Sequence, residues 1–120
     1  MFIYGLFLYL SMENEDKSVF LEYFGDYPLM RVLDFLIESR GMDYSMTEIA
    51  KNSGVGWTAF SDIWPQLIEK DIVRFTRKIG NAKLYKLNLE NPWVKELIKI
   101  DNLIAKLETN KLLKEKPINA

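Results

Sequence analysis

Residues Ser45–Leu89 read SMTEIAKNSGVGWTAFSDIWPQLIEKDIVRFTRKIGNAKLYKLNL, and this stretch decides the fold. Glu48 stands three residues after Ser45, a capping-box spacing that predicts a helix over residues 46–52. Gly54 follows that helix and is free to adopt a positive φ, which lets a second helix leave at a sharp angle. The apolar periodicity of residues 57–69 predicts that second helix. The pattern is therefore helix, tight turn, helix.

A two-stranded ribbon is expected next. Apolar side chains alternate in residues 72–77 and 83–89, and the Gly80-Asn81 pair between them suits a hairpin turn within a loop over residues 78–82. All charged side chains of the ribbon are basic, and they are Arg74, Arg77, Lys78, Lys83 and Lys86. We therefore expect a basic wing over residues 73–87.

Further helices are expected on both sides of this unit. Ser18 can cap a short helix over residues 19–24, and apolar positions at helical spacing predict a longer one over residues 28–40. Asn91-Pro92 marks the start of a last helix. Five apolar residues repeat along it at alternating spacings of four and three, the pattern of a coiled-coil seam. They are Trp93, Leu97, Ile100, Ile104 and Leu107.

These elements together predict an α+β fold, a winged helix-turn-helix with a three-helix core, a β-hairpin wing and a C-terminal dimerisation helix. The expected divisions are a hydrophobic then acidic extension over residues 1–17, the winged domain over 18–90 and the last helix over 91–116. The seam has a second interpretation, in which it covers the core of its own domain. Because residues 100–107 extend beyond what so small a core can use, a homodimer is favoured.

The composition narrows the classes of function. Apolar residues make up 48% of the 120 residues, which suffices for a core. Cysteine and histidine are both absent, which removes thiolate and imidazole ligands and the usual general base. We therefore expect no catalytic residues, no metal and no cofactor. Since the formal net charge is only −1, nucleic-acid binding must depend on where the charges lie.

The first ten residues are apolar apart from Gly5. Such a run is too short for a membrane-spanning helix of about 20 residues, and it lacks the basic region of a signal peptide. Two interpretations stay open. One is a hydrophobic arm that packs on a partner subunit, and the other, which we favour, is an upstream extension with the biological start at Met12. A cytoplasmic protein without a membrane anchor is expected.

Nine side chains are expected to contact DNA. They are Thr47, Lys51, Trp57, Thr58, Ser61, Arg77, Lys78, Asn81 and Lys83. Those of helix 57–69 would face base edges in the major groove, those of the wing would contact phosphates or the minor groove, and those of the preceding helix would contact the backbone. Two alternatives stay open: Trp57 packs partly buried against helix 28–40, and the wing cations only protect a solvated edge strand.

Several short motifs resemble the archaeal winged helix-turn-helix transcriptional regulators, which are akin to the MarR- and ArsR-type repressors. The motifs are RVLDFL at 31–36, TEIA at 47–50, Gly54-Val55, Trp64-Pro65, RKIGNAKLYKLN at 77–88 and Asn91-Pro92. The resemblance covers roughly residues 19–107 and implies DNA binding, dimers and transcriptional control. Gly56-Trp57 stands where members of the family often have a basic or small polar residue.

The sequence therefore predicts a regulator that binds double-stranded DNA as a homodimer and reads the major groove with helix 57–69. The alternative is a winged-helix module for protein–protein contact or assembly, without sequence-specific DNA binding. The near-zero net charge and the place of Trp57 in a polar face favour this alternative. The sequence indicates neither the operator nor a small-molecule effector.

Overall fold

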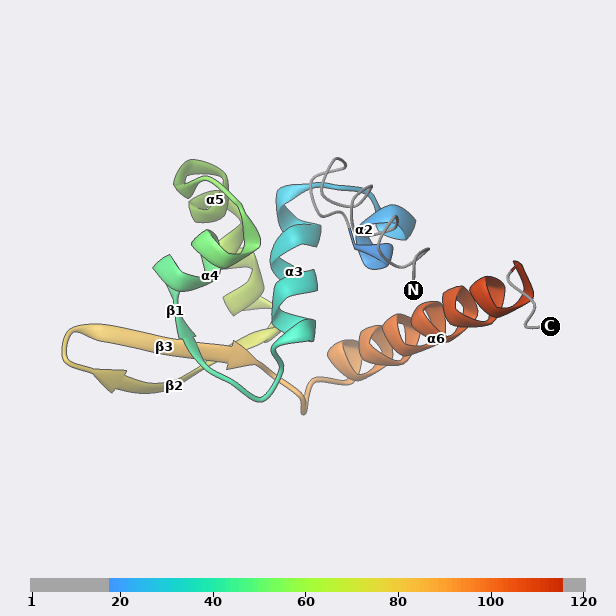
Figure 1. Cartoon of the computed structure of the whole chain (residues 1–120). Helices are drawn as coiled ribbons and strands as arrows, with labels where there is room; N and C mark the ends of the chain where they lie inside the picture. The colour runs from blue at the N-terminus through green and yellow to red at the C-terminus, as the bar shows by residue number, and fades with distance from the viewer. Residues whose placement is uncertain (1–17, 116–120) are drawn as a thin grey trace.

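The computed structural model describes residues 18–115 (Figure 1). Its elements are α2 (Val19–Phe24), α3 (Pro28–Glu38), β1 (Tyr44–Ser45), α4 (Met46–Ser53), α5 (Trp57–Glu69), β2 (Val73–Ile79), β3 (Ala82–Leu87) and α6 (Pro92–Glu115). This is the predicted α+β arrangement of a helical core with an antiparallel hairpin. The expectations for residues 1–17 and 116 lie outside the described residues.

The helix-turn-helix forms as the sequence predicts. Ser45 Oγ accepts a hydrogen bond from the N–H of Glu48 at 3.2 Å, and Glu48 Oε1 accepts one from the N–H of Ser45 at 2.8 Å. Both arms of the capping box are therefore present at the start of α4. Gly54 ends α4 with a φ of 71°. Residues with a Cβ adopt this left-handed backbone conformation only with strain. Trp57 then begins α5.

The end of α3 differs from the prediction. The helix stops at Glu38, two residues before the expected end at Arg40. Ser39 leaves helical geometry with a φ of −107° and a ψ of 24°, and its hydroxyl donates to the carbonyl of Phe35 at 2.7 Å. The carbonyl of Phe35 also accepts a hydrogen bond from the N–H of Ser39 at 3.0 Å, so this group is paired where the chain turns.

The sheet has the strand order β1-β3-β2, and both neighbouring pairs are antiparallel. β2 and β3 form the wing and stay paired as far as Ile79 opposite Ala82. The loop predicted over residues 78–82 is therefore only the two-residue turn Gly80-Asn81. Gly80 adopts a φ of 61°, which permits so tight a connection.

A bulge interrupts the wing at Thr76. Phe75 lies opposite Tyr85 and Arg77 lies opposite Leu84, so Thr76 is the extra residue of β2. Its hydroxyl oxygen lies 3.2 Å from the carbonyl oxygen of Leu84, so the extra residue stays close to β3. A bulge of this kind shifts the alternation of side chains beyond it by one residue.

One cluster of buried apolar side chains unites the helices with the inner part of the sheet. Among its fully buried members are Val32 of α3, Ile49 of α4, Phe60 of α5 and Val94 of α6. The start of α6 thus belongs to the same core, and α6 also packs against α2. In Figure 1 the wing projects from one end of the molecule and α6 extends at the other. The elements expected to bind DNA therefore lie away from the expected dimer helix.

Candidate nucleic-acid interface

The outer side of α5 carries the residues predicted to face base edges. Trp57, Thr58 and Ser61 are exposed, whereas Phe60 and Trp64 are buried beneath them. The indole of Trp57 stacks on Phe60 with ring centroids 5.4 Å apart, and 53% of the Trp57 surface stays exposed. Its aromatic partner is therefore a residue of α5 itself, and the side chain is more than half exposed. The N-terminal part of α5 offers a polar surface with one fixed aromatic ring.

Cations face one another across the wing. Arg74 lies directly opposite Lys86, and Lys78 lies directly opposite Lys83. Residues 72–89 contain no acidic side chain that would separate these charges. Like charges placed directly opposite destabilise an antiparallel pair. An anion bound between them would therefore stabilise the hairpin.

The two cation pairs lie on opposite faces of the wing. Side chains alternate along β3, so Lys83 and Tyr85 share one face while Lys86 lies on the other. The ring of Tyr85 meets that of Trp64 in α5 edge-on, with centroids 5.2 Å apart. The face that carries Lys83, and Lys78 opposite it, is therefore the one directed toward α5.

Arg77, the remaining wing cation, is held by an acidic residue that no sequence motif singles out. Its guanidinium donates from Nε to Asp43 Oδ2 at 3.0 Å and from Nη2 to Asp43 Oδ1 at 3.2 Å. The hydroxyl of Thr76 donates to Asp43 Oδ2 at 2.6 Å. These hydrogen bonds, that from Arg77 first, lower the pKa of Asp43 to about 2. Arg77 thus reaches a phosphate only in competition with a carboxylate.

No local pattern in the sequence marks Asp43 as the partner of Arg77. Asp43 precedes the two-residue strand β1, and it approaches the wing because Tyr44 pairs with Tyr85 of β3. Residues 42–44 alone predict at most a very short strand. The contact between Asp43 and Arg77 can be predicted only once the pairing of β1 with β3 is known.

The side chains of α4 predicted to contact DNA are exposed, but the start of the helix is partly occupied by its own cap. Thr47 and Lys51 are both exposed, as backbone contacts require. The N–H groups of Ser45 and Glu48, however, are engaged by the capping box, which brings the carboxylate of Glu48 to that end. The N-terminus of α4 is therefore less suited to a phosphate than Lys51 is.

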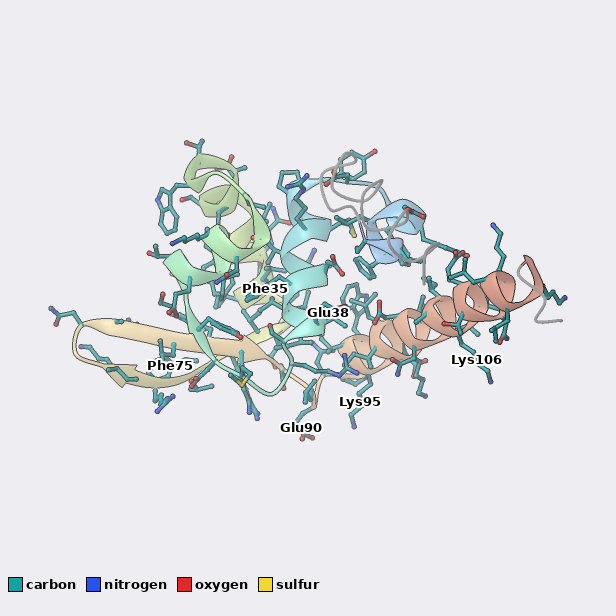
Figure 2. All side chains as sticks on the ribbon, in the orientation of Figure 1. Phe35, Glu38, Phe75, Glu90, Lys95 and Lys106 are labelled. Atoms are coloured by element: carbon teal, nitrogen blue, oxygen red, sulfur yellow. The ribbon has the colours of Figure 1, made fainter. Side chains whose placement is uncertain are left out.

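The remaining predicted side chain, Asn81, is exposed in the turn at the end of the wing. Figure 1 shows α4, α5 and the wing gathered at the end of the molecule remote from α6, and Figure 2 shows the side chains that they carry there. All nine predicted residues thus lie at exposed positions of one region. Within the part of the chain that the structure describes, Arg77 alone among them is paired with a carboxylate.

The predicted seam of α6 is divided between two sides of the helix. Leu97 and Ile104 are 9% and 5% exposed and pack within their own chain. The other three members, Trp93, Ile100 and Leu107, are exposed, and Leu103 joins them with 53% of its surface open. The interpretation in which the seam covers the core of its own domain thus holds for Leu97 and Ile104, while the dimer interpretation stays a prediction for the exposed members.

Two other classes of site are absent from residues 18–115. Within this range no cluster of acidic, histidine or cysteine side chains has a geometry that would hold a metal ion. None of the helices formed by these residues combines the length and the apolar character needed to cross a membrane.

Comparison with known proteins gives a fold and no more. No family model matches the chain, and no curated protein matches its sequence. Among solved structures, a mutant of MepR from a multidrug-resistant S. aureus clinical isolate has a TM-score of 0.55 at 14% identity, over 95% of this chain and 81% of that one. The adhesin competence repressor AdcR from Streptococcus pyogenes has a TM-score of 0.54 at 14% identity, over 90% and 82%.

A third structure, the MarR family transcriptional regulator SPO1453 from Silicibacter pomeroyi, has a TM-score of 0.52 at 18% identity, over 94% of this chain and 79% of that one. The fold is a winged helix-turn-helix. This confirms the predicted fold class, including the long C-terminal helix. At these identities a shared fold does not carry a shared function.

Proposed function

We propose that this chain is a DNA-binding transcription regulator that uses α5 and the wing on one duplex. The observation that carries the proposal is the pair Lys78 and Lys83, which face each other on the α5 side of a hairpin without acidic residues. Because the two lysines repel each other across the strands, the pair favours a partner with closely spaced negative charges. The phosphates of a DNA backbone provide that spacing.

The proposed division of labour follows the geometry of the fold. α5 enters the major groove with Trp57, Thr58 and Ser61 on its outer side, where the hydroxyl groups can bond bases or phosphates. The lysine pair of the wing then holds the adjacent backbone or minor groove. Repressors such as AdcR share this fold, which supports the proposal at the level of architecture.

We further propose that two copies associate through the exposed side of α6. Trp93, Ile100, Leu103 and Leu107 form an apolar row at spacings that recur along one side of the helix, and all four are open to solvent within the single chain. A two-fold dimer would remove this row from water. It would also present two copies of α5 to successive half-sites of a duplex.

A salt titration tests the proposal. Binding to random duplex should weaken linearly in log–log form as salt rises, and the double variant Lys78→Ala, Lys83→Ala should lower the slope by about two units. Lys95→Ala with Lys106→Ala is the matched control, because it removes two exposed lysines from α6 (Figure 2). An unchanged slope in the wing variant, or equal losses in both variants, would remove the wing from the DNA interface.

The second candidate function is a protein-binding module. Arg77 is already neutralised by Asp43, and two large apolar side chains of the wing, Phe75 and Ile79, are 52% and 55% exposed. Phe75 lies opposite Tyr85 and Ile79 lies opposite Ala82, so the two side chains stand on opposite faces of the hairpin and each could contact a protein partner. Binding to duplex that is absent or insensitive to salt would favour this candidate.

A further inference from the structure

Five aromatic rings form a continuous chain from the start of α5 to the wing. Trp57 stacks on Phe60, and Phe60 stacks on Trp64 with centroids 5.1 Å apart and an interplanar angle of 23°. Trp64 meets Tyr85 edge-on, and Tyr85 meets Phe75 edge-on with centroids 5.9 Å apart. The chain therefore connects the helix expected to read bases with the hairpin expected to hold phosphates.

The inner and outer rings of this chain differ in exposure. Phe60 and Trp64 are 0% and 5% exposed, whereas the terminal rings, Trp57 and Phe75, are 53% and 52% exposed. Figure 2 shows Phe75 on the wing, outside the helical body. The buried rings fix the positions of the exposed ones. Each end of the chain is thus an aromatic surface held in place before any partner arrives.

Trp57 has one covered face and one free face. The interplanar angle of 26° with Phe60 shows that the covered face is stacked, so much of the remaining exposure belongs to the opposite face. A tryptophan has a single donor and reads hydrogen-bonding edges poorly. A fixed ring with a free face is instead suited to stacking against a nucleobase.

The charges around these rings are suited to the phosphates that would accompany such a base. Lys78 and Lys83 lie on the face of the wing that also carries Tyr85 and Phe75. Exposed aromatic rings beside cations are the combination by which proteins bind single strands without sequence preference. In a closed duplex the base faces are covered by their neighbours, so this use of Trp57 requires unpaired bases.

We propose that this face also binds single-stranded DNA, with one unpaired base stacked on the free face of Trp57 and another on Phe75. The lysine pair Lys78 and Lys83, which lies beyond Phe75 toward the turn of the wing, holds phosphates of the same strand. A single strand would bind at the same end of the molecule as a duplex. Trp57 would then stack on the face of an unpaired base, a contact that the base edges in a major groove do not provide.

The test compares two strands of equal charge: oligothymidine of about 12 nucleotides and an abasic strand of the same length. The full-length chain should bind oligothymidine more tightly than the abasic strand, and its tryptophan fluorescence should be quenched by oligothymidine alone. Trp57→Ala should weaken oligothymidine binding by about 5- to 150-fold and abolish this quenching. Trp57→Phe should retain most of the affinity yet lose the quenching, because a phenyl ring still stacks.

Tyr27→Ala serves as the control, since it removes an exposed aromatic ring that lies at the start of α3 and belongs to neither α5 nor the wing. It should leave both affinities unchanged. Equal affinity for the two strands, or Trp57→Ala binding oligothymidine as the wild type does, would overturn the stacking proposal. If salt-sensitive duplex binding persisted in that case, the proposed regulator function would stand while this inference failed. If neither duplex nor single strand were bound, both would fail.

Discussion

Asp43 and Arg77 form a two-point ion pair between residues 34 positions apart in the sequence, with Nε–Oδ2 and Nη2–Oδ1 distances of 3.0 and 3.2 Å. The guanidinium remains 62% exposed while its charge is matched by a carboxylate. Arg77 is therefore already paired before any nucleic acid binds. Asp43 takes the position that a phosphate would need.

Replacement of Asp43 by asparagine should strengthen duplex binding. The change frees Arg77 for a phosphate and should increase the salt slope by about one unit. The measurement is a salt titration of binding to random duplex. Glu90→Gln is the control, because it removes one exposed negative charge near the start of α6. Weaker binding by Asp43→Asn would instead mean that the carboxylate holds Arg77 in its binding orientation.

The ion pair between Asp43 and Arg77 should make the free energy of unfolding depend on pH in the acid range. The pKa of Asp43 is lowered from 3.8 to about 2 in the folded chain, so its stabilising contribution is complete above the ordinary carboxyl range and is lost as the pH falls toward 2. Urea unfolding of the wild type and of Asp43→Asn should show a difference in stability near neutral pH. That difference should disappear as the pH falls from about 4 to about 2. A difference that stayed constant over this range would show that Asp43 does not stabilise the fold through its charge.

Gly54→Ala should destabilise the helix-turn-helix by about 1–2 kcal/mol, the cost of the left-handed conformation for a residue with a Cβ. Gly54 has a φ of 71°, and an added Cβ would lie 3.0 Å from Nη1 of Arg31. Thermal unfolding followed by circular dichroism measures the loss. Gly56→Ala is the matched control, since its φ is −64° and an added Cβ would meet nothing within 4 Å. Equal losses at both positions would contradict the conformational explanation.

Two neighbouring residues of α6 should respond in opposite ways. Leu103→Asp should convert the proposed dimer to a monomer that stays folded, because Leu103 is exposed in the single chain. Ile104→Ala should leave association intact but lower the free energy of unfolding by about 2–5 kcal/mol, because Ile104 is 5% exposed. Light scattering with size-exclusion chromatography, together with urea unfolding, separates the two. Dissociation caused by the Ile104 variant alone would reverse the assignment of the two sides.

The parts of the fold that could be predicted depend on interactions between residues close in sequence. The capping box of Ser45 and Glu48, the positive φ of Gly54 and the hairpin turn at Gly80-Asn81 are all encoded within a few residues, and all three are present. The end of α3 at Glu38 is also local, but Ser39, which follows it, bonds the carbonyl four residues back as many serines inside helices do.

The parts that could not be predicted depend on contacts between distant segments. The seam of α6 looks uniform in sequence, and only packing against the core buries Leu97 and leaves Ile100 exposed. The Asp43 contact requires the pairing of β1 with β3. The sequence shows that the wing is basic. It does not show which of its cations are paired with a carboxylate and which are open to a partner.

The extra residue at Thr76 decides which positive charges a partner can reach. With that residue unpaired, Lys78 stands opposite Lys83, and Arg77 stands opposite Leu84 on the side where Asp43 neutralises it. If Thr76 were instead paired like its neighbours, Arg77 would stand across from Lys83 and Lys78 would turn away from α5. The two cations would exchange faces without any change of net charge or composition. Two hairpins with the same basic residues would then display different electrostatic surfaces if one of them lacked this irregularity, so a count of cations alone is a poor guide to what such a ribbon binds.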